Sequence, residues 1–416
     1  MKIGIVTTWF ERGAAYVSKQ FEQVLQEEHE VFIYARGGEK YAINDPIWDK
    51  KNVTWGKNIR SRFALTLMDK KDFKSWIDYN SIDILLFNEQ HWFEPLLWCK
   101  DWGIKTVAYI DYYTKETVDL FNIYDLLICN TKRHYSVFKK SNKAQYLPWG
   151  TDTHIFTNDD KSELVNSDFV TFFHSCGMGA KRKGTEQLIK AFSKTKYAKK
   201  LIIHTQQEIT GNNLVELISD LEAQGRLEII NKTVPAPGLF HLGDVYLYPS
   251  LLEGIGLTIA EALSSGLATV VPDNGPMNEF VNDGFNGLLI KKGKCYSRED
   301  GYYWPLCEIE IEDLTEKIDF LAQNKNEVIN LKENARASAI ENLSLKKNMR
   351  SLSRLFEMTE YTTLNLETKN KIIRFNKKGF GRFNKLYIRL YFFINGVYVT
   401  YDYLKAFVNK INHLRL

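Results

Sequence analysis

Residues 248–272, YPSLLEGIGLTIAEALSSGLATVVP, contain the order of strand, turn, helix and strand that decides the fold of this chain. An apolar run at 244–250 predicts a buried parallel strand, and 258–266 has the composition of a short helix that stops at Gly266. The turn at 251–256 lies at the carboxyl end of the first strand. Ligands bind at that edge of doubly wound α/β sheets, so the turn is where a site is expected.

Two glutamates stand in this stretch among small and apolar residues, Glu253 in the turn and Glu261 in the helix. Carboxylates are rare in such surroundings unless a polar group meets them. Gly254 and Gly256 let a ligand approach the backbone closely, and the start of the following helix favours a phosphate. Carboxylates are poor phosphate ligands but good bidentate acceptors for pairs of sugar hydroxyls, so the pattern indicates a nucleotide sugar. The alternative, two solvated surface charges, is disfavoured by the Pro-Ser pair upstream and by NGPMNEFVNDGFNGLLI downstream.

Short apolar runs separated by helical periodicity recur along the chain. Runs without strict alternation are typical of strands that are buried on both faces of a parallel sheet. They form two successive series, which predict an α/β chain with two doubly wound, Rossmann-like domains joined by the polar segment 148–163. The runs lie at 2–8, 29–35, 82–88, 105–111, 125–131, 168–175, 200–206, 226–232, 244–250 and 268–274.

Composition fits a folded two-domain chain of 416 residues, with 44% hydrophobic and 25% charged residues. The five cysteines are scattered, with no CxxC and no metal-ligand spacing, which predicts a reducing compartment and no disulfide framework. The N-terminal residues are expected to form a strand rather than a secretion signal. We therefore expect a cytoplasmic protein.

The end of the chain is basic, whereas the rest is mildly acidic. Residues 361–416 carry seven Lys and four Arg against two acidic residues, a net charge of +9 in a chain whose total is +4. Apolar residues recur at helical spacing in 383–394 and 404–411. The longest uncharged run, 390–401, is too short to span a bilayer. Two alternatives stay open: these helices dock on the protein body, or they lie on the inner face of the cell membrane as a peripheral contact.

The stretch PSLLEGIGLTIAE resembles the signature of retaining glycosyltransferases of the GT-B fold, in the large group with two glutamates separated by seven residues (glycosyltransferase family four, glycosyl transferases group one). The resemblance covers roughly residues 1–358. It is strong over 240–290 and recognisable at YLPWGTDTHIF, which resembles the family's interdomain linker.

The resemblance implies the GT-B fold, with two Rossmann-like domains that face a cleft. It assigns an acceptor domain to 1–155 and a nucleotide-sugar donor domain to 156–342. A helix at 343–360 is expected to return toward the N-terminal domain. The basic amphipathic extension is 361–416.

The family also implies roles for residues of the donor domain. Glu261 would bind the ribose hydroxyls and Glu253 the transferred sugar, with Lys183, in HSCGMGAKRKGTEQLIKAF, as a catalytic diphosphate contact. The family's arginine five residues before this lysine is Met178 here, and Lys181 or Arg182 could replace it, although both could equally be solvated charges at a helix start. The remaining donor-binding candidates are Gly254, Ile255, Gly256, Leu257 and Thr258.

The N-terminal domain departs further from the family pattern. Gly13 in WFERGAA would face the diphosphate. The family's histidine near 105–111 is missing, so Asp111 and His91 are the candidate catalytic residues that could orient an acceptor hydroxyl, although a lone loop histidine is more often structural. The chain lacks GxGxxG, which argues against a dinucleotide-binding oxidoreductase.

The predicted function is retaining transfer of a sugar, of the hexosyltransferase type, from a nucleotide-diphosphate sugar to a glycan or lipid-linked acceptor in cell-surface polysaccharide or glycolipid synthesis. The nucleotide (UDP or GDP) stays open. The resemblance implies no cofactor and no metal, and NDD at 158–160 is given little weight. The alternatives are a nucleotide-sugar epimerase of the same fold or a non-catalytic nucleotide-sugar-binding subunit. Nucleic-acid binding by the tail is disfavoured because its aromatic residues lie in amphipathic stripes.

Overall fold

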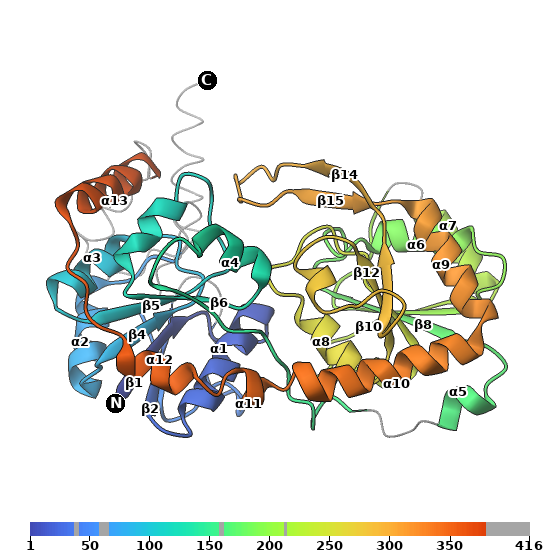
Figure 1. The fold of residues 1–416 in the computed structure, drawn as a ribbon, viewed down its shortest axis with the longest axis horizontal. Helices are drawn as coiled ribbons and strands as arrows, with labels where there is room; N and C mark the ends of the chain where they lie inside the picture. Colours follow the sequence, from blue (N-terminus) through green and yellow to red (C-terminus); the bar gives the residue numbers. More distant parts are fainter. Residues whose placement is uncertain (37–40, 58–65, 158–161, 212–213, 380–416) are drawn as a thin grey trace. The chain divides into compact units, whose positions relative to one another are not determined.

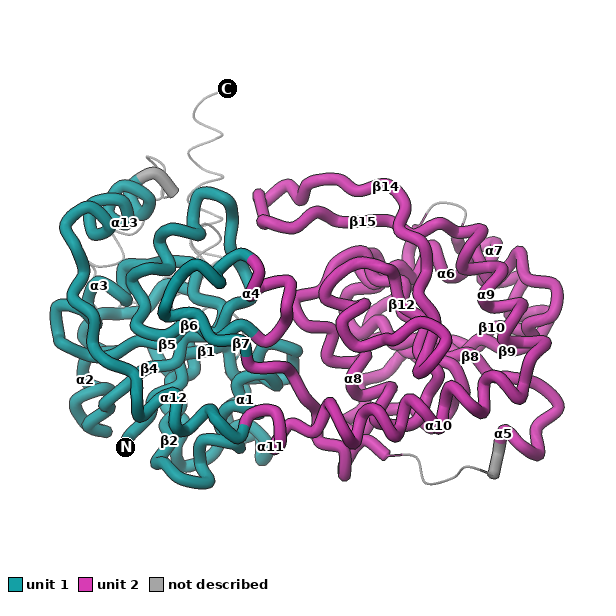
Figure 2. The backbone as a smooth tube through the Cα atoms, in the orientation of Figure 1, with its two compact units in different colours: residues 1–129, 137–146, 350–416 teal, residues 130–136, 147–349 magenta. Residues whose placement is uncertain are grey.

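A computed structural model of the chain describes residues 1–36, 41–57, 66–157, 162–211 and 214–379. Contacts divide the chain into two compact units, which Figure 2 shows in different colours. Unit 1 comprises 1–129, 137–146 and the segment from 350 onward, and unit 2 comprises 130–136 and 147–349. Each unit is built on its own parallel sheet (Figure 1).

The sheet of unit 1 has seven strands in the order β3-β2-β1-β4-β5-β6-β7, and every pair is parallel. Central strands such as β4, with the sequence ILLF, are buried along their whole length. The strands are β1 (Lys2–Thr7), β2 (Glu30–Ala35), β3 (Val53–Trp55), β4 (Ile84–Phe87), β5 (Lys105–Tyr109), β6 (Leu126–Cys129) and β7 (Ala144–Tyr146). The helices are α1 (Gly13–Leu25), α2 (Lys70–Asn80), α3 (Glu94–Asp101), η1 (Val118–Ile123), α12 (Leu352–Met358) and α13 (Leu366–Gly379). Helix α4 (Lys132–Phe138) crosses the boundary between the units, with 132–136 in unit 2 and the last two residues in unit 1.

The sheet of unit 2 has six parallel strands in the order β10-β9-β8-β11-β12-β13. The strands are β8 (Thr171–Gly177), β9 (Lys200–Thr205), β10 (Leu227–Asn231), β11 (Val245–Leu247), β12 (Ala268–Pro272) and β13 (Gly287–Ile290). The helices are α5 (Ser162–Asn166), α6 (Thr185–Ser193), α7 (Leu214–Ala223), η2 (Phe240–Leu242), α8 (Leu257–Ser264), η3 (Met277–Glu279), α9 (Ile311–Gln323), α10 (Lys325–Asn342) and α11 (Leu345–Asn348).

Both sheets reverse their strand order beside the first strand of the unit, β1 in unit 1 and β8 in unit 2. This is the doubly wound order of Rossmann-like folds, and it places a ligand site outside the carboxyl ends of the strands at the reversal. The prediction of two Rossmann-like domains is therefore confirmed. The reason that it succeeded is that buried parallel strands leave near-continuous apolar runs in the sequence.

An antiparallel hairpin of β14 (Lys292–Tyr296) and β15 (Leu306–Ile309) follows the last strand of unit 2. Cys295 and Cys307 lie directly opposite each other in this pair and form a disulfide. The expectation that no cysteines pair was wrong, because directly opposite positions in a hairpin bring distant side chains together. The other three cysteines, Cys99, Cys129 and Cys176, are buried thiols.

The described part of the C-terminal extension packs on unit 1. Helix α13 contacts α3 and η1, and its Phe375 meets Phe93 edge to face with ring centroids 5.8 Å apart. Asn376 Nδ2 donates a hydrogen bond to Glu94 at 3.1 Å. The apolar stripes expected at 383–394 and 404–411 lie outside the described residues. None of the helices within 1–379 that the structure describes combines the length and apolar character needed to cross a membrane.

Candidate functional site

The turn between β11 and α8 is built around Gly256, whose φ of +92° lies in the left-handed region. A Cβ at this position would also come within 2.9 Å of Ile259. Gly256 therefore starts α8 at a point that a residue with a side chain could not occupy without strain. The Ile259 N–H already donates to the carbonyl of Gly256 at 2.9 Å. The N–H groups of Leu257 and Thr258 precede it at the positive end of α8, where a helix offers donors to a ligand.

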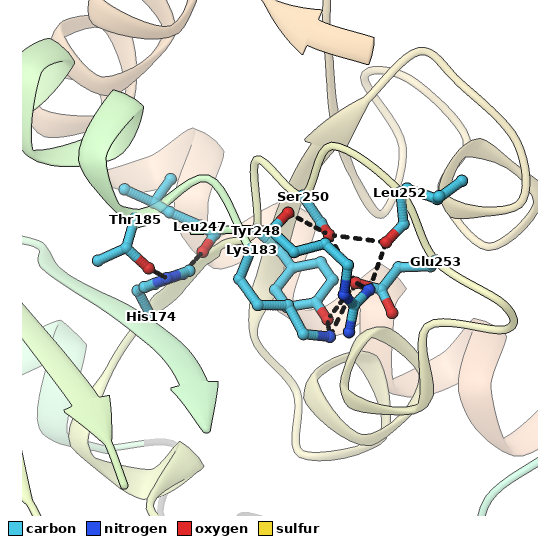
Figure 3. A network of polar contacts seen from close by, with 9 residues as sticks. His174, Lys183, Thr185, Leu247, Tyr248, Ser250, Leu252 and Glu253 are labelled. Atoms are coloured by element: carbon cyan, nitrogen blue, oxygen red, sulfur yellow. Dashed lines mark hydrogen bonds and ion pairs between the residues drawn. The ribbon is translucent and has the colours of Figure 1, made fainter. Parts of the chain in front are cut away.

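The start of α6 lies against the same turn. His174 of β8 donates from Nδ1 to the carbonyl of Leu247 at 2.7 Å and contacts Thr185 Oγ1 with Nε2 at 2.8 Å (Figure 3). The Leu251 N–H donates to the carbonyl of Arg182 at 2.9 Å. These bonds fix two segments of the sequence, 182–185 and 247–251, side by side at the carboxyl edge of the sheet.

One oxygen of Glu253 is the centre of the resulting polar network (Figure 3). Its Oε1 accepts hydrogen bonds from Arg182 Nη1 at 2.9 Å, Lys183 Nζ at 2.8 Å and Ser250 Oγ at 2.5 Å. The hydroxyl of Tyr248 donates to the same oxygen at 3.0 Å. Burial alone would raise the pKa of Glu253, but the charges of Arg182 and Lys183 and the hydrogen bonds outweigh it and hold the pKa at about 2. Glu253 is therefore an anion at neutral pH.

The two cations beside Glu253 differ in exposure. The side chain of Lys183 is 15% exposed, whereas that of Arg182 is 42% exposed. Burial lowers the pKa of Lys183 to about 8, against the opposing charge of Glu253. The charge of Glu253 raises the pKa of Arg182 above its ordinary value. Two positive charges thus stand at the start of α6, and the more exposed one is available to an anionic ligand.

Glu261, in the middle of α8, has the opposite electrostatics. Burial raises its pKa to about 7, and the charge of Lys183 opposes the shift only in part. The two glutamates of the turn and helix therefore titrate far apart, one near pH 2 and the other near pH 7. Such separation is typical of functional sites, although structural ion-pair networks produce it too.

A second contact with the turn comes from residues that the sequence did not single out. His134, which belongs to unit 2 together with the rest of 130–136, donates from Nε2 to the carbonyl of Gly254 at 3.0 Å. Burial lowers the pKa of His134 to about 4, so the ring is neutral at pH 7. Glu279 accepts the N–H groups of Lys132 and Arg133 at 2.6 and 2.8 Å and fixes the start of this segment. A single histidine far from the motif gave no signal in the sequence.

The candidates of unit 1 also lie at strand ends. Gly13 is the first residue of α1, Asp111 follows β5, and the ring of His91, after β4, stacks on Tyr112 with centroids 4.4 Å apart. Burial raises the pKa of Asp111 well above its usual range, and the nearby charge of Glu89 adds to the shift.

Sequence reasoning missed an ion pair at the same edge of unit 1. Arg12 Nη2 lies 3.3 Å from the carboxylate of Glu89, which has a positive φ of +51°. The two residues lie in separate segments of the sequence, WFERGAA and the loop after β4, and nothing in either segment indicates that they form an ion pair.

Of the three cationic candidates of the donor domain, Lys181 lies apart from the polar network around Glu253. It is exposed and makes no ion pair with the residues that the structure describes, unlike Arg182 and Lys183. Met178, at the position of the family's arginine, has 53% of its surface exposed. The guanidinium beside Glu253 therefore comes from Arg182.

Comparison with known proteins gives a family match and a related enzyme. Residues 157–338 match the family Glycosyl transferases group 1. An Escherichia coli enzyme, UDP-Gal:alpha-D-GlcNAc-diphosphoundecaprenol alpha-1,3-galactosyltransferase, is 34% identical over 73 residues, which are 18% of this chain and 19% of that enzyme. This match therefore spans about a fifth of the relative's length.

Two solved structures cover most of the chain. Anabaena HepE in complex with UDP has a TM-score of 0.66 and 15% identity, and the match covers 86% of this chain and 99% of that one. A glycosyltransferase from Rickettsia africae has a TM-score of 0.66 and 16% identity, covering 87% and 99%. Together with the two Rossmann-like sheets, these likenesses show the GT-B fold. The residues that match the family, 157–338, all lie in unit 2.

Proposed function

We propose that this chain is a retaining glycosyltransferase that moves a sugar from a nucleotide-diphosphate sugar to a glycan or lipid-linked acceptor. One observation carries the proposal: cations and carboxylates meet at the carboxyl edge of one sheet. Arg182 and Lys183 lie at the start of α6 and contact Glu253 in the turn before α8. Glu261 lies within α8 itself. A diphosphate flanked by a ribose and a sugar has the complementary chemistry. The family match to residues 157–338 supports the same conclusion.

In the proposed reaction the bond from the anomeric carbon to the diphosphate breaks and a bond to an acceptor oxygen forms. Arg182 and Lys183 stabilise the negative charge that develops on the departing diphosphate, together with the N–H groups at the start of α8. The departing phosphate oxygen takes the acceptor's proton, so no protein nucleophile is required. The scheme assigns no role to a metal or a cofactor.

Each glutamate has a separate role in this scheme. Glu261 accepts the ribose hydroxyls in its ionised form. Glu253 is already saturated at Oε1, and its Oε2 makes no hydrogen bond with any residue in the described ranges, so that oxygen can accept from hydroxyls of the transferred sugar. In unit 1, Asp111 and His91 are proposed to orient the acceptor.

For the donor we propose a UDP-sugar. HepE was solved in complex with UDP, and the Escherichia coli relative is a UDP-Gal transferase with an acceptor linked to diphosphoundecaprenol. A lipid-linked acceptor would place the reaction at the inner face of the cell membrane, with residues 361–416 as the proposed contact. An epimerase or a non-catalytic binding subunit is the alternative.

The test is a thermal-shift panel of UDP, GDP, ADP and TDP and their sugars on the wild type and on Glu261→Ala. Ligand at about a hundred times its Kd stabilises the folded state by roughly 2.7 kcal/mol. We expect the UDP series to raise the midpoint and Glu261→Ala to abolish the rise. Incubation with the UDP-sugar and a lipid-linked acceptor then separates the alternatives, because a transferase needs the acceptor, an epimerase interconverts sugars without it, and a binding subunit does neither.

A further inference from the structure

A histidine and two glutamates meet in unit 1, away from the strand ends described above. Glu28 and His29 lie in the turn between α1 and β2, and Glu357 lies in α12. One ligand atom from each of the three residues lies within 4.8 Å of the other two. The distance from His29 Nε2 to Glu357 Oε1 is 3.9 Å, which is too long for a hydrogen bond.

The imidazole of His29 is buried and makes no hydrogen bond within the described part of the chain. Its side chain is 3% exposed, and neither Nδ1 nor Nε2 makes a hydrogen bond in the described part of the chain. A buried polar atom that is left without a partner costs about 1–3 kcal/mol. A buried imidazole that makes no hydrogen bond within the described chain, and that lies within 4.8 Å of two carboxylates, is therefore a feature that hydrogen bonding does not explain.

The chemistry of the three donors points to one ion. One imidazole nitrogen and two carboxylate oxygens suit Zn²⁺, whereas Mg²⁺ and Ca²⁺ favour sets made of oxygen alone. Zinc binds these donors at about 2.0–2.2 Å, which sets tetrahedral donors roughly 3.3 Å apart. The glutamate side chain of α12 is 56% exposed and can close the gap by rotating, with water as a fourth ligand.

We propose that Glu28, His29 and Glu357 form a zinc site that clamps α12 onto the turn after α1. Helix α12 packs on α1 (Figure 1). Its residues Leu352, Ser353 and Phe356 are buried. The ion would join that packing near the C-terminal end of α12, about two turns beyond the point where residue 350 rejoins unit 1. Its role is structural, and it does not depend on the proposed sugar transfer.

The test is zinc binding by the full-length chain after removal of any polyhistidine tag and of bound metal by chelation. Calorimetric titration with ZnCl₂ should show one site in the wild type. Glu357→Gln, a conservative change at an exposed side chain, should raise the Kd at least tenfold, and His29→Gln should abolish binding at this site. Glu27→Gln is the matched control, because Glu27 is an exposed acid in the same turn but outside the cluster. MgCl₂ should bind to none of the four proteins at this site.

Hydrogen exchange supplies an independent readout. Zinc should slow exchange of the α12 amides in the wild type and in Glu27→Gln, but not in Glu357→Gln. The proposal is overturned if the wild type binds no zinc at up to millimolar concentration, or if Glu357→Gln and Glu27→Gln bind it equally well. It is overturned equally if zinc binds without slowing exchange in α12. If His29→Gln fails to fold, the comparison between the two glutamate variants still decides.

Discussion

Gly184 lies so close to the carbonyl oxygen of Pro249 that a Cβ on residue 184 would come within 2.0 Å of it. The two residues are 65 positions apart, and each belongs to a separate recognisable motif. Gly184 has a left-handed φ of +72° and immediately precedes α6. This conformation lets Arg182 and Lys183, just before it, contact the segment 248–256. A glycine here is required by both its conformation and its neighbour, which explains why the Lys-Gly pair and the Pro-Ser pair occur together.

Gly184→Ala should therefore destabilise the protein and weaken nucleotide binding. The left-handed conformation costs about 1–2 kcal/mol for alanine, and the clash with backbone adds to it, so we expect more than 2 kcal/mol in urea unfolding. Gly225→Ala is the matched control, because Gly225 has a φ of +68° but no atom within 4 Å of a Cβ. Gly225→Ala should lower the free energy of unfolding only by the cost of the left-handed conformation, and it should bind UDP as tightly as the wild type does. Equal losses in the two variants would show that the contact with Pro249 is unimportant.

Lys183→Ala should lower kcat/KM for sugar transfer by about 10²–10³-fold, as removal of one donor to a developing oxyanion does. Lys181→Ala should leave it within about twofold, because Lys181 is exposed and outside the network. Steady-state rates over a range of donor concentrations check both values. Similar losses in both variants would point to general attraction of the anionic donor rather than a positioned contact.

Nucleotide affinity should rise with pH between 6 and 8. The pKa of Glu261 is about 7, and only the ionised form accepts two ribose hydroxyls. The ionised fraction of Glu261 grows about tenfold over this range, whereas the charged fraction of Lys183, whose pKa is about 8, falls about twofold, so the Kd for UDP should fall about fivefold. Titration calorimetry of the wild type and Glu261→Gln at several pH values is the check, since the variant should bind weakly with little of this dependence. A wild-type Kd that is flat in pH would remove Glu261 from the ribose contact.

Glu253→Gln should change how the free energy of unfolding depends on pH under acidic conditions. The pKa of Glu253 is lowered from its ordinary 4.5 to about 2 in the folded protein. The unfolded chain therefore binds the proton first, and the carboxylate contributes stability above pH 4.5 that is lost as the pH falls toward 2. The shift corresponds to about 3 kcal/mol. Urea unfolding from pH 3 to 7 should show the wild type losing its advantage over Glu253→Gln as the pH falls, and parallel curves would contradict the network.

Sequence reasoning predicted the fold, which the structure confirms, and it selected Glu253 and Glu261 as candidates, because both predictions depend on local signals. Buried parallel strands appear as apolar runs, and the turn with Gly256 and the helix behind it lie within one short stretch. Contacts across long separations gave no such signal. The meeting of Arg182 with Glu253, the support of Gly254 by His134 and the pairing of Cys295 with Cys307 all depend on the three-dimensional course of loops.

The candidates of unit 1 were harder to predict for the same reason. Asp111 was considered because the family's histidine is missing near 105–111, and His91 because it follows a predicted strand; the structure places both after strands. The ion pair between Arg12 and Glu89 was not predicted, because the two residues lie in separate segments of the sequence.

The return of the chain to unit 1 after residue 349 sets an order of events during synthesis. The ribosome completes the strands of unit 1 by residue 146, then makes the main part of unit 2, residues 147–349, and only then produces α12. At about 5–20 residues per second this interval lasts roughly 10–40 s. During that time the surface of α1 that α12 covers has no partner from its own chain. Unit 2, by contrast, is made almost without interruption, so it is the unit that can complete its folding first.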